Sequence, residues 1–346
     1  MTAHHLLIKT AFKQPAHRRP FWIVNQSSLF TDMIEQFEKK SDYHTILTNP
    51  VDATEISLQS FYELKVDAIE LFTIPFLPAF YMNLRGVFNK HEILLNHPIR
   101  SSSQVKNLKI PDYNAELSFI TETIRNLRAQ SYDVPVIGCC AGPFSMTSFL
   151  IEGRISSDIP LAKSVLYSRE SAFCQLLDIM SDFTKTSIQA QIDAGAEAIC
   201  IHDPLASALT FDNFNRIYIP ILASLISDTN HDAIPIIFST ENVNGYLDSL
   251  TNVGFDVISL DFRCSINKIL HETDSKTSFQ GNFDPLLLLG TPDSIQESIE
   301  SHLHNLGRIH GFIGTFSGEI PPYIPFANLK HFIRKFQELS SGYATQ

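Results

Sequence analysis

The sequence predicts an α/β fold, a single (β/α)₈ TIM barrel that spans all 346 residues. Short apolar segments recur eight times, most of them precede a helical pattern, and most are continuous rather than alternating. Continuous runs are typical of parallel strands covered on both faces, and eight strand–helix repeats match a barrel of about 250 residues or more. The predicted strands are 21–24, 66–72, 134–139, 198–202, 234–239, 256–261, 277–280 and 311–316.

The stretch 135–153, PVIGCCAGPFSMTSFLIEG, shows one repeat in full. An apolar run at 136–140 has the length of a buried strand, and an Ala-Gly-Pro break at 141–143 precedes apolar residues at helical spacing. A strand that runs into a helix through a tight glycine turn is half of a βαβ unit. The loop between them lies where α/β proteins place their chemistry.

Helix signals separate the other predicted strands. Capping residues at 52–55 predict a helix start, and the longest helical pattern, 170–194, ends at Gly195. The connection 75–111 is the longest insertion and is interpreted as a lid or a subunit contact, whereas residues 1–19 are interpreted as a solvated, basic N-terminal arm. The alternative fold is a doubly wound open sheet. The missing GxGxxG after the first strand disfavours it, so one barrel domain over 1–346 is predicted.

Charge and cysteine usage limit the expected partners and location. Acidic residues outnumber basic ones by 37 to 26, the net charge is −11, and no basic block offsets it, so neither nucleic acid nor a membrane surface is an expected partner. The longest apolar run, 217–226, is far below the ~20 residues of a membrane helix. The five cysteines lack CxxC spacing, which favours reduced thiols in a cytoplasmic protein.

Candidate functional residues follow the predicted strands, because barrels carry their active sites at the carboxyl ends of the strands. Five carboxylates there can supply a general acid or base: Asp203, Glu241, Asp261, Asp284 and Glu319. Asp203 and Asp284 each precede a proline, so capping of a turn or helix start is the alternative role for both. We predict Asp203 and Glu241 as the catalytic residues.

One guanidinium and one imidazole also lie at strand ends. Arg263 is predicted to hold a substrate carboxylate or phosphate, with a salt bridge to Asp261 as the alternative. His202 lies two residues after Cys200 on the same strand face, which is a candidate pair of metal ligands. No CxxC or HExxH spacing supports a metal, and a hydrogen-bonded structural histidine is favoured. The sequence therefore predicts no metal and no cofactor.

Several segments, in order along the chain, resemble the uroporphyrinogen decarboxylase family. Residues 138–153, GCCAGPFSMTSFLIEG, are similar to the family segment GFxGxPxTxxSYxxEG, and residues 280–285, QGNFDP, to QGNxDP. Further similar segments are 20–26, 191–209, 254–262 and 311–322. The resemblance implies a (β/α)₈ barrel, a homodimer, and removal of carboxylates from the acetate side chains of a tetrapyrrole without a cofactor, a step of porphyrin biosynthesis.

Strand-end positions and the matching segments together predict a set of residues that bind a small molecule at the barrel mouth. These residues lie in or near the matching segments, and they are Gln26, Phe149, Arg263, Asn282, Asp284 and Glu319.

Several positions that carry the family's chemistry differ in this sequence. The arginines of the first motif are Asn25 and Leu29, the aspartate after the second strand is Ile74, the tyrosine of SYxxEG is Phe149, and the histidine of the last motif is Gly318. A substrate that carries many carboxylates needs cationic partners, and a protonated pyrrole needs a nearby anion. We therefore expect a divergent carboxy-lyase that acts on a tetrapyrrole or on another carboxylated small molecule.

Two further functions stay open. One is an enzyme similar to the corrinoid-linked methyltransferases, a sister branch whose HxC…C zinc ligands would fall near Ser239, Glu241 and Gly318. The other is a barrel that binds a tetrapyrrole or another small molecule without catalysis.

Overall fold

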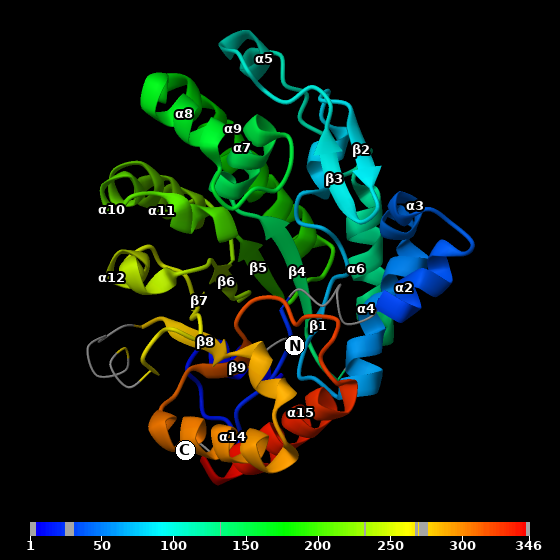
Figure 1. The fold of residues 1–346 in the computed structure, drawn as a ribbon, viewed down its shortest axis with the longest axis vertical. Helices are drawn as coiled ribbons and strands as arrows, with labels where there is room; N and C mark the ends of the chain where they lie inside the picture. The colour runs from blue at the N-terminus through cyan, green and yellow to red at the C-terminus, as the bar shows by residue number, and fades with distance from the viewer. Residues whose placement is uncertain are drawn as a thin grey trace.

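Seven parallel strands form one curled sheet, in the order β1-β4-β5-β6-β7-β8-β9. The computed structural model describes residues 5–24, 31–131, 133–231, 233–266, 269 and 276–343. Figure 1 shows the strands at the centre with helices around them. The strands are β1 Ile69–Glu70, β4 Val136–Ala141, β5 Ala198–His202, β6 Ile236–Ser239, β7 Val257–Ser259, β8 Ser278–Phe283 and β9 Phe312–Phe316.

The segment 20–22 closes this sheet into a barrel. The Gly314 N–H of β9 donates to the Pro20 carbonyl at 2.9 Å, and the Asp67 N–H just before β1 donates to the Phe21 carbonyl at 2.8 Å. Phe21 and Gly314 form a single parallel bridge. In place of the first predicted strand, 21–24, the structure has a short segment that hydrogen-bonds to the chain on both of its sides. Each of the other seven predicted strands overlaps an observed one. The predicted (β/α)₈ barrel is confirmed.

Helices cover the outside of the barrel, with α14 and α15 below the strands in Figure 1 and α4 and α6 to their right. The outer helices are α4 Pro50–Leu64, α6 Ser118–Gln130, α7 Pro143–Glu152, α8 Pro160–Ser168, α9 Glu170–Asp193, α10 Phe211–Asn213, α11 Ile219–Ser227, α12 Leu247–Leu250, α14 Pro292–Leu306 and α15 Phe326–Ser340. The start predicted at 52–55 is wrong, because Asn49 caps α4 by accepting from the Val51 N–H at 2.9 Å. The long helix predicted at 170–194 matches α9 to within one residue.

A short helix, α1 Leu6–Ala11, fills the amino end of the barrel. Leu7, Ile8 and Ala11 pack with inward-facing strand residues such as Trp22 and Ile137, and all of these side chains are buried. The interpretation of residues 1–19 as a solvated arm is therefore wrong for α1. The basic residues of this segment predict an exposed arm, but the apolar face of α1 determines where the helix packs.

Most of the insertion 75–111 lies in the upper right part of Figure 1, beyond the strands. It contains a hairpin of β2 Gly86–Asn89 and β3 Glu92–Leu95, the helix α5 Ser102–Lys106, and the single turn η3 Leu77–Tyr81. The Leu95 N–H donates to the Gly153 carbonyl at 2.8 Å and so ties the hairpin to the end of α7. Its role as a lid or a subunit contact stays a prediction.

The remaining elements are short. They are α2 Thr31–Glu38, α3 Tyr43–Thr48, η4 Pro204–Ala208, η5 Phe214–Tyr218, η6 Val243–Gly245, η7 Pro285–Leu289 and η8 Ser341–Tyr343. Across the part of the chain that the structure describes, no helix has both the length and the apolar character needed to cross a membrane.

Candidate functional site

Four ionisable or sulfur-bearing side chains face one another inside the barrel, near the carboxyl ends of three adjacent strands. Ala68, Ile137 and Cys200 belong to the buried cluster in the barrel interior. Side chains two residues apart share a strand face, so Glu70 on β1, Cys139 on β4 and His202 on β5 face the same interior. Cys139 and Cys200 are also register partners on neighbouring strands. We call Glu70, Cys139, Cys200 and His202 the mouth cluster.

The centre of the mouth cluster is an acid–imidazole pair. His202 Nε2 lies 3.1 Å from Glu70 Oε1, and the two side chains are only 13% and 5% exposed. Burial opposes a charge on His202, but Cys200 and the hydrogen bonds to Cys139, Cys200 and Glu70 outweigh it and hold the pKa of His202 well above its usual range. This raised pKa favours the protonated imidazole of His202.

The two thiols of the mouth cluster behave differently from the imidazole. Burial raises the pKa of Cys139 to about 11, partly offset by its hydrogen bond to His202, and burial also raises the pKa of Cys200. Both sulfur atoms are therefore protonated at neutral pH unless a cation replaces the proton.

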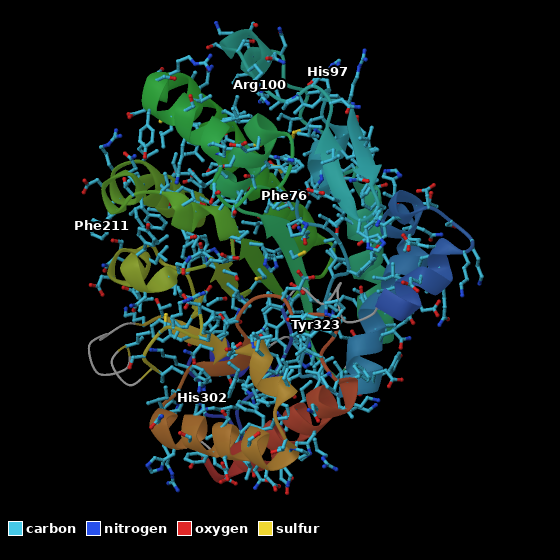
Figure 2. The ribbon with its side chains drawn as sticks, in the orientation of Figure 1. Phe76, His97, Arg100, Phe211, His302 and Tyr323 are labelled. Atoms are coloured by element: carbon cyan, nitrogen blue, oxygen red, sulfur yellow. The ribbon has the colours of Figure 1, made fainter. Side chains whose placement is uncertain are left out.

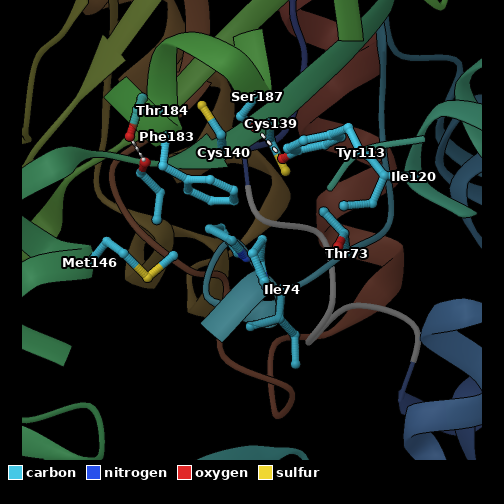
Figure 3. A pocket seen from close by; sticks show the side chains of 13 residues that line it. Thr73, Ile74, Tyr113, Ile120, Cys139, Cys140, Met146, Phe183, Thr184 and Ser187 are labelled. Atoms are coloured by element: carbon cyan, nitrogen blue, oxygen red, sulfur yellow. Dashed lines mark hydrogen bonds between the residues drawn. The ribbon is translucent and has the colours of Figure 1, made fainter. Parts of the chain in front are cut away.

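A small hollow lies next to the mouth cluster, under the loop that follows β1 (Figure 3). Cys139, Cys140, Thr73 and Tyr113 are among its lining residues, and the Tyr113 hydroxyl hydrogen-bonds with Ser187 of α9. The hollow has a volume of about 10 Å³, which is space for about one water molecule. In this conformation the hollow is too small for a tetrapyrrole.

Asp203, predicted as catalytic, is placed as a cap. Its carboxylate is fully buried and accepts from the Ser145 N–H at 2.7 Å and the Phe144 N–H at 3.3 Å, at the start of α7. The Tyr218 hydroxyl donates to the same carboxylate. A Cβ at Gly142 would collide with Asp203, so that position requires glycine. Burial raises the pKa of Asp203 to about 7 against these hydrogen bonds.

The predicted capping alternative therefore describes the contacts of Asp203, although the helix it caps is α7 rather than the turn that follows it. Asp284 caps the turn that follows it, η7, by accepting from the Leu286 N–H at 2.9 Å. Asn282 is buried and donates to the carbonyls of Asp261 and Cys264 at 3.1 Å and 2.9 Å, which fixes the loop after β7.

The other predicted site residues do not meet in one cluster. Glu241 and Glu319 are exposed. The Arg263 side chain is 61% exposed, lies over the Phe262 ring, and has Nη1 3.8 Å from Asp261 Oδ1, so the alternative salt bridge is present at long range. Phe149 is fully buried against Phe76, with ring centroids 5.0 Å apart. Figure 2 labels Phe76 among the side chains of the fold. Gln26, together with Asn25 and Leu29, lies outside the described residues.

Glu70 is a member of the mouth cluster that sequence reasoning missed. It lies within the predicted strand 66–72 rather than after it, so a search confined to strand ends passes over it. The available signal was a carboxylate two residues after Ala68 in an apolar strand, which predicts a charged side chain facing the barrel interior.

The described residues contain one group suited to a metal ion. Ligand atoms of Glu70, Cys200 and His202 all lie within 4.8 Å of one another. The zinc set of the methyltransferase branch does not fit this chain, because its positions hold Ser239, an exposed Glu241 and Gly318.

The fold is a closed (β/α)₈ barrel, and its buried acid–imidazole pair lies near the carboxyl ends of the strands, where barrel enzymes carry their active sites. A family model described as Uroporphyrinogen decarboxylase (URO-D) matches residues 2–339. The chain belongs to the uroporphyrinogen decarboxylase family, a family of enzymes, and the resemblance seen in the sequence is confirmed.

Curated relatives and solved structures agree with this placement. The chain is 28% identical to the uroporphyrinogen decarboxylase of Coxiella burnetii over 96% of this chain and 94% of that protein. It is 28% identical to the one from Chlorobaculum tepidum over 99% and 100%. A methyltransferase from Methanosarcina mazei matches with a TM-score of 0.81 and 20% identity over 98% of both chains. A B12-independent methionine synthase from Shewanella sp. W3-18-1 matches with a TM-score of 0.57 and 13% identity over 87% of this chain and 90% of that chain. These two structures show the fold alone.

Proposed function

We propose that the chain is a cofactor-free carboxy-lyase that acts on a carboxylated small molecule, either a tetrapyrrole or a smaller compound, bound at the barrel mouth. Membership in the uroporphyrinogen decarboxylase family supports the reaction class. The observation that carries the proposal is the buried hydrogen bond between Glu70 and His202 at 3.1 Å, at the end of the barrel where the chemistry of this fold takes place.

A decarboxylation needs one proton for each carboxylate that is lost. Breaking the bond to the carboxylate releases CO₂ and leaves its electron pair on carbon, and a proton from His202 forms the new C–H bond there. Glu70 stabilises the imidazolium before transfer and orients the ring. The exposed guanidinium of Arg263 is the proposed contact for a second substrate carboxylate.

Glu70 and His202 can supply the ionisable groups that this sequence lacks relative to the family pattern. Ile74, Phe149 and Gly318 stand where the family has an aspartate, a tyrosine and a histidine, and none of the three can transfer a proton. Glu70 and His202 place ionisable groups elsewhere on the inner wall. We therefore expect a substrate different from uroporphyrinogen, or a different pose of it.

The test is an assay in D₂O with uroporphyrinogen and with smaller aromatic acids, in which mass spectrometry detects products that have lost carboxylate and gained deuterium. Replacing the proton donor typically costs about 10²–10⁴-fold in rate, so His202→Gln and Glu70→Gln should lose activity to that degree. The matched control is His304→Gln, which changes an exposed histidine on α14. Full activity in His202→Gln would overturn the proposed mechanism.

A second candidate is transfer of a methyl group between a corrinoid and a thiol. The observation that favours it is the pair of buried thiols, Cys139 and Cys200, next to His202. Absorption spectra of methylcobalamin mixed with the chain and a thiol would show demethylation if it occurs. We also propose that the chain forms a homodimer in the cytoplasm, as the resemblance implies, and light scattering of the purified chain measures the assembly state.

A further inference from the structure

We infer that Glu70, Cys200 and His202 form a binding site for one borderline-soft divalent metal ion, with Zn²⁺ as the best match. The inference rests on the residues of the proposed function but not on the proposed reaction. It depends on three donor atoms that converge in the barrel interior within 4.8 Å of one another. Around a tetrahedral zinc with bonds of about 2.0–2.3 Å, donor atoms lie about 3.3–3.8 Å apart. A closure of about 1 Å would therefore complete the site.

The donor set is chemically suited to zinc rather than to a hard cation. A thiol, an imidazole and a carboxylate are all zinc ligands, whereas Ca²⁺ and Mg²⁺ prefer oxygen alone. Three protein ligands leave a fourth position open, which is the arrangement of a zinc ion that also binds water or substrate.

The three ligands come from two strands of the barrel. Glu70 lies on β1 and Cys200 and His202 on β5, and β4 separates these strands in the sheet. Cys139 of β4, the register partner of Cys200, lies between these two strands. In the family segment GFxGxP this position is a phenylalanine, so the thiol of Cys139 adds a polar group where the family pattern is apolar.

Metal and proton compete for the same side chains. Binding requires a neutral imidazole and a thiolate, so it releases protons from His202 and Cys200. A zinc-loaded chain cannot donate a proton from His202. Bound Zn²⁺ is therefore expected to suppress the proposed carboxy-lyase reaction, and a chelator is expected to restore it.

The direct test is a titration of the metal-free, reduced full-length chain with Co²⁺, which replaces zinc and absorbs light. We expect thiolate-to-cobalt absorption in the near ultraviolet, visible bands of a tetrahedral ion, saturation at one Co²⁺ per chain, and displacement by Zn²⁺. Cys200→Ser and His202→Gln should weaken binding by more than about 100-fold, because even groups that only orient a ligand contribute about 10–100-fold.

The matched control is Cys140→Ser. Cys140 follows Cys139 on β4, so its side chain leaves the opposite face of the strand, and it is not among the three residues whose ligand atoms converge. Binding unchanged in Cys140→Ser and lost in Cys200→Ser supports the site. An unaltered cobalt spectrum in Cys200→Ser, or no saturable binding by the wild-type chain, would overturn it.

A second measurement needs no variant of the site. Zn²⁺ should slow alkylation of the Cys200 thiol in partly denaturing buffer by at least tenfold, as measured by peptide mass spectrometry, and leave the rate at Cys174 on α9 unchanged. Equal rates at Cys200 with and without Zn²⁺ would refute the inference. Neither measurement uses a substrate, so failure of the carboxy-lyase proposal leaves both readouts intact.

Discussion

Replacing Asp203 with alanine is expected to destabilise the barrel by about 3–6 kcal/mol. The substitution removes the acceptor for the Ser145 and Phe144 N–H groups and for the Tyr218 hydroxyl, all of them buried. Each of these three donors left without a partner is expected to cost about 1–2 kcal/mol, the lower part of the range for buried groups, because loss of a helix cap typically costs only about 1 kcal/mol. Asp203→Asn keeps one acceptor oxygen, so a smaller loss of about 1–2 kcal/mol is expected.

Urea unfolding measured by fluorescence is a suitable assay. Trp22 is the only tryptophan of the chain, and its buried indole donates to Gln280 Oε1 at 3.0 Å, so its emission reports on the closed barrel. Circular dichroism of the helices provides an independent probe of the same transition.

Asp284→Ala is the matched control, because this aspartate caps only the short, partly exposed turn η7. Its removal should cost about 1 kcal/mol or less. If Asp203→Ala destabilises the chain no more than Asp284→Ala does, the reasoning about Asp203 is refuted.

Three further predictions concern stability. Folding raises the pKa of Asp203 from 3.8 to about 7, so protonated Asp203 contributes to the free energy of unfolding. This contribution is fully present below about pH 4 and is lost as the pH rises through about 7. Unfolding free energies measured at several pH values should show this fall in the wild type and not in Asp203→Asn. Phe149→Tyr should destabilise the chain by about 1–3 kcal/mol, because Phe149 is fully buried against Phe76 and an added hydroxyl would need a new hydrogen-bond partner. The variant should gain no decarboxylase activity, and a stable, active variant would contradict this. Leu7→Ala should cost about 2–4 kcal/mol by opening a cavity under the barrel, and Leu6→Ala, at a partly exposed position, should cost less in the same urea assay.

Most of the barrel could be predicted because parallel strands covered on both faces leave a direct pattern in the sequence. Runs such as 198–202 are continuous, buried and short, and they match the observed β5. The closing segment 20–22 and the helix α1 could not be predicted in the same way. Their positions depend on long-range contacts with Gly314 and with the barrel interior, and local spacing contains no information about those contacts.

The candidate site was harder to predict than the fold. A search for polar residues at strand ends finds His202 but passes over Glu70, because the direction of a side chain depends on strand register. Register turns Glu70 and His202 toward each other and places Asp203 under α7. The partner of Asp203 lies 58 residues away at Ser145, on a helix whose approach to β5 follows only from the tertiary structure.

The closure of the barrel by residues 20–22 also affects how the chain is made. Trp22 meets Gln280, 258 residues later in the sequence, and Phe21 pairs with β9 near the other end of the chain. During synthesis residues 20–22 leave the ribosome long before Gln280 and β9, so these contacts cannot form until almost the whole chain has been made. Until then, the apolar faces of α1 and Trp22 are exposed, so chaperone binding to this segment should be strongest on nascent chains that lack β9.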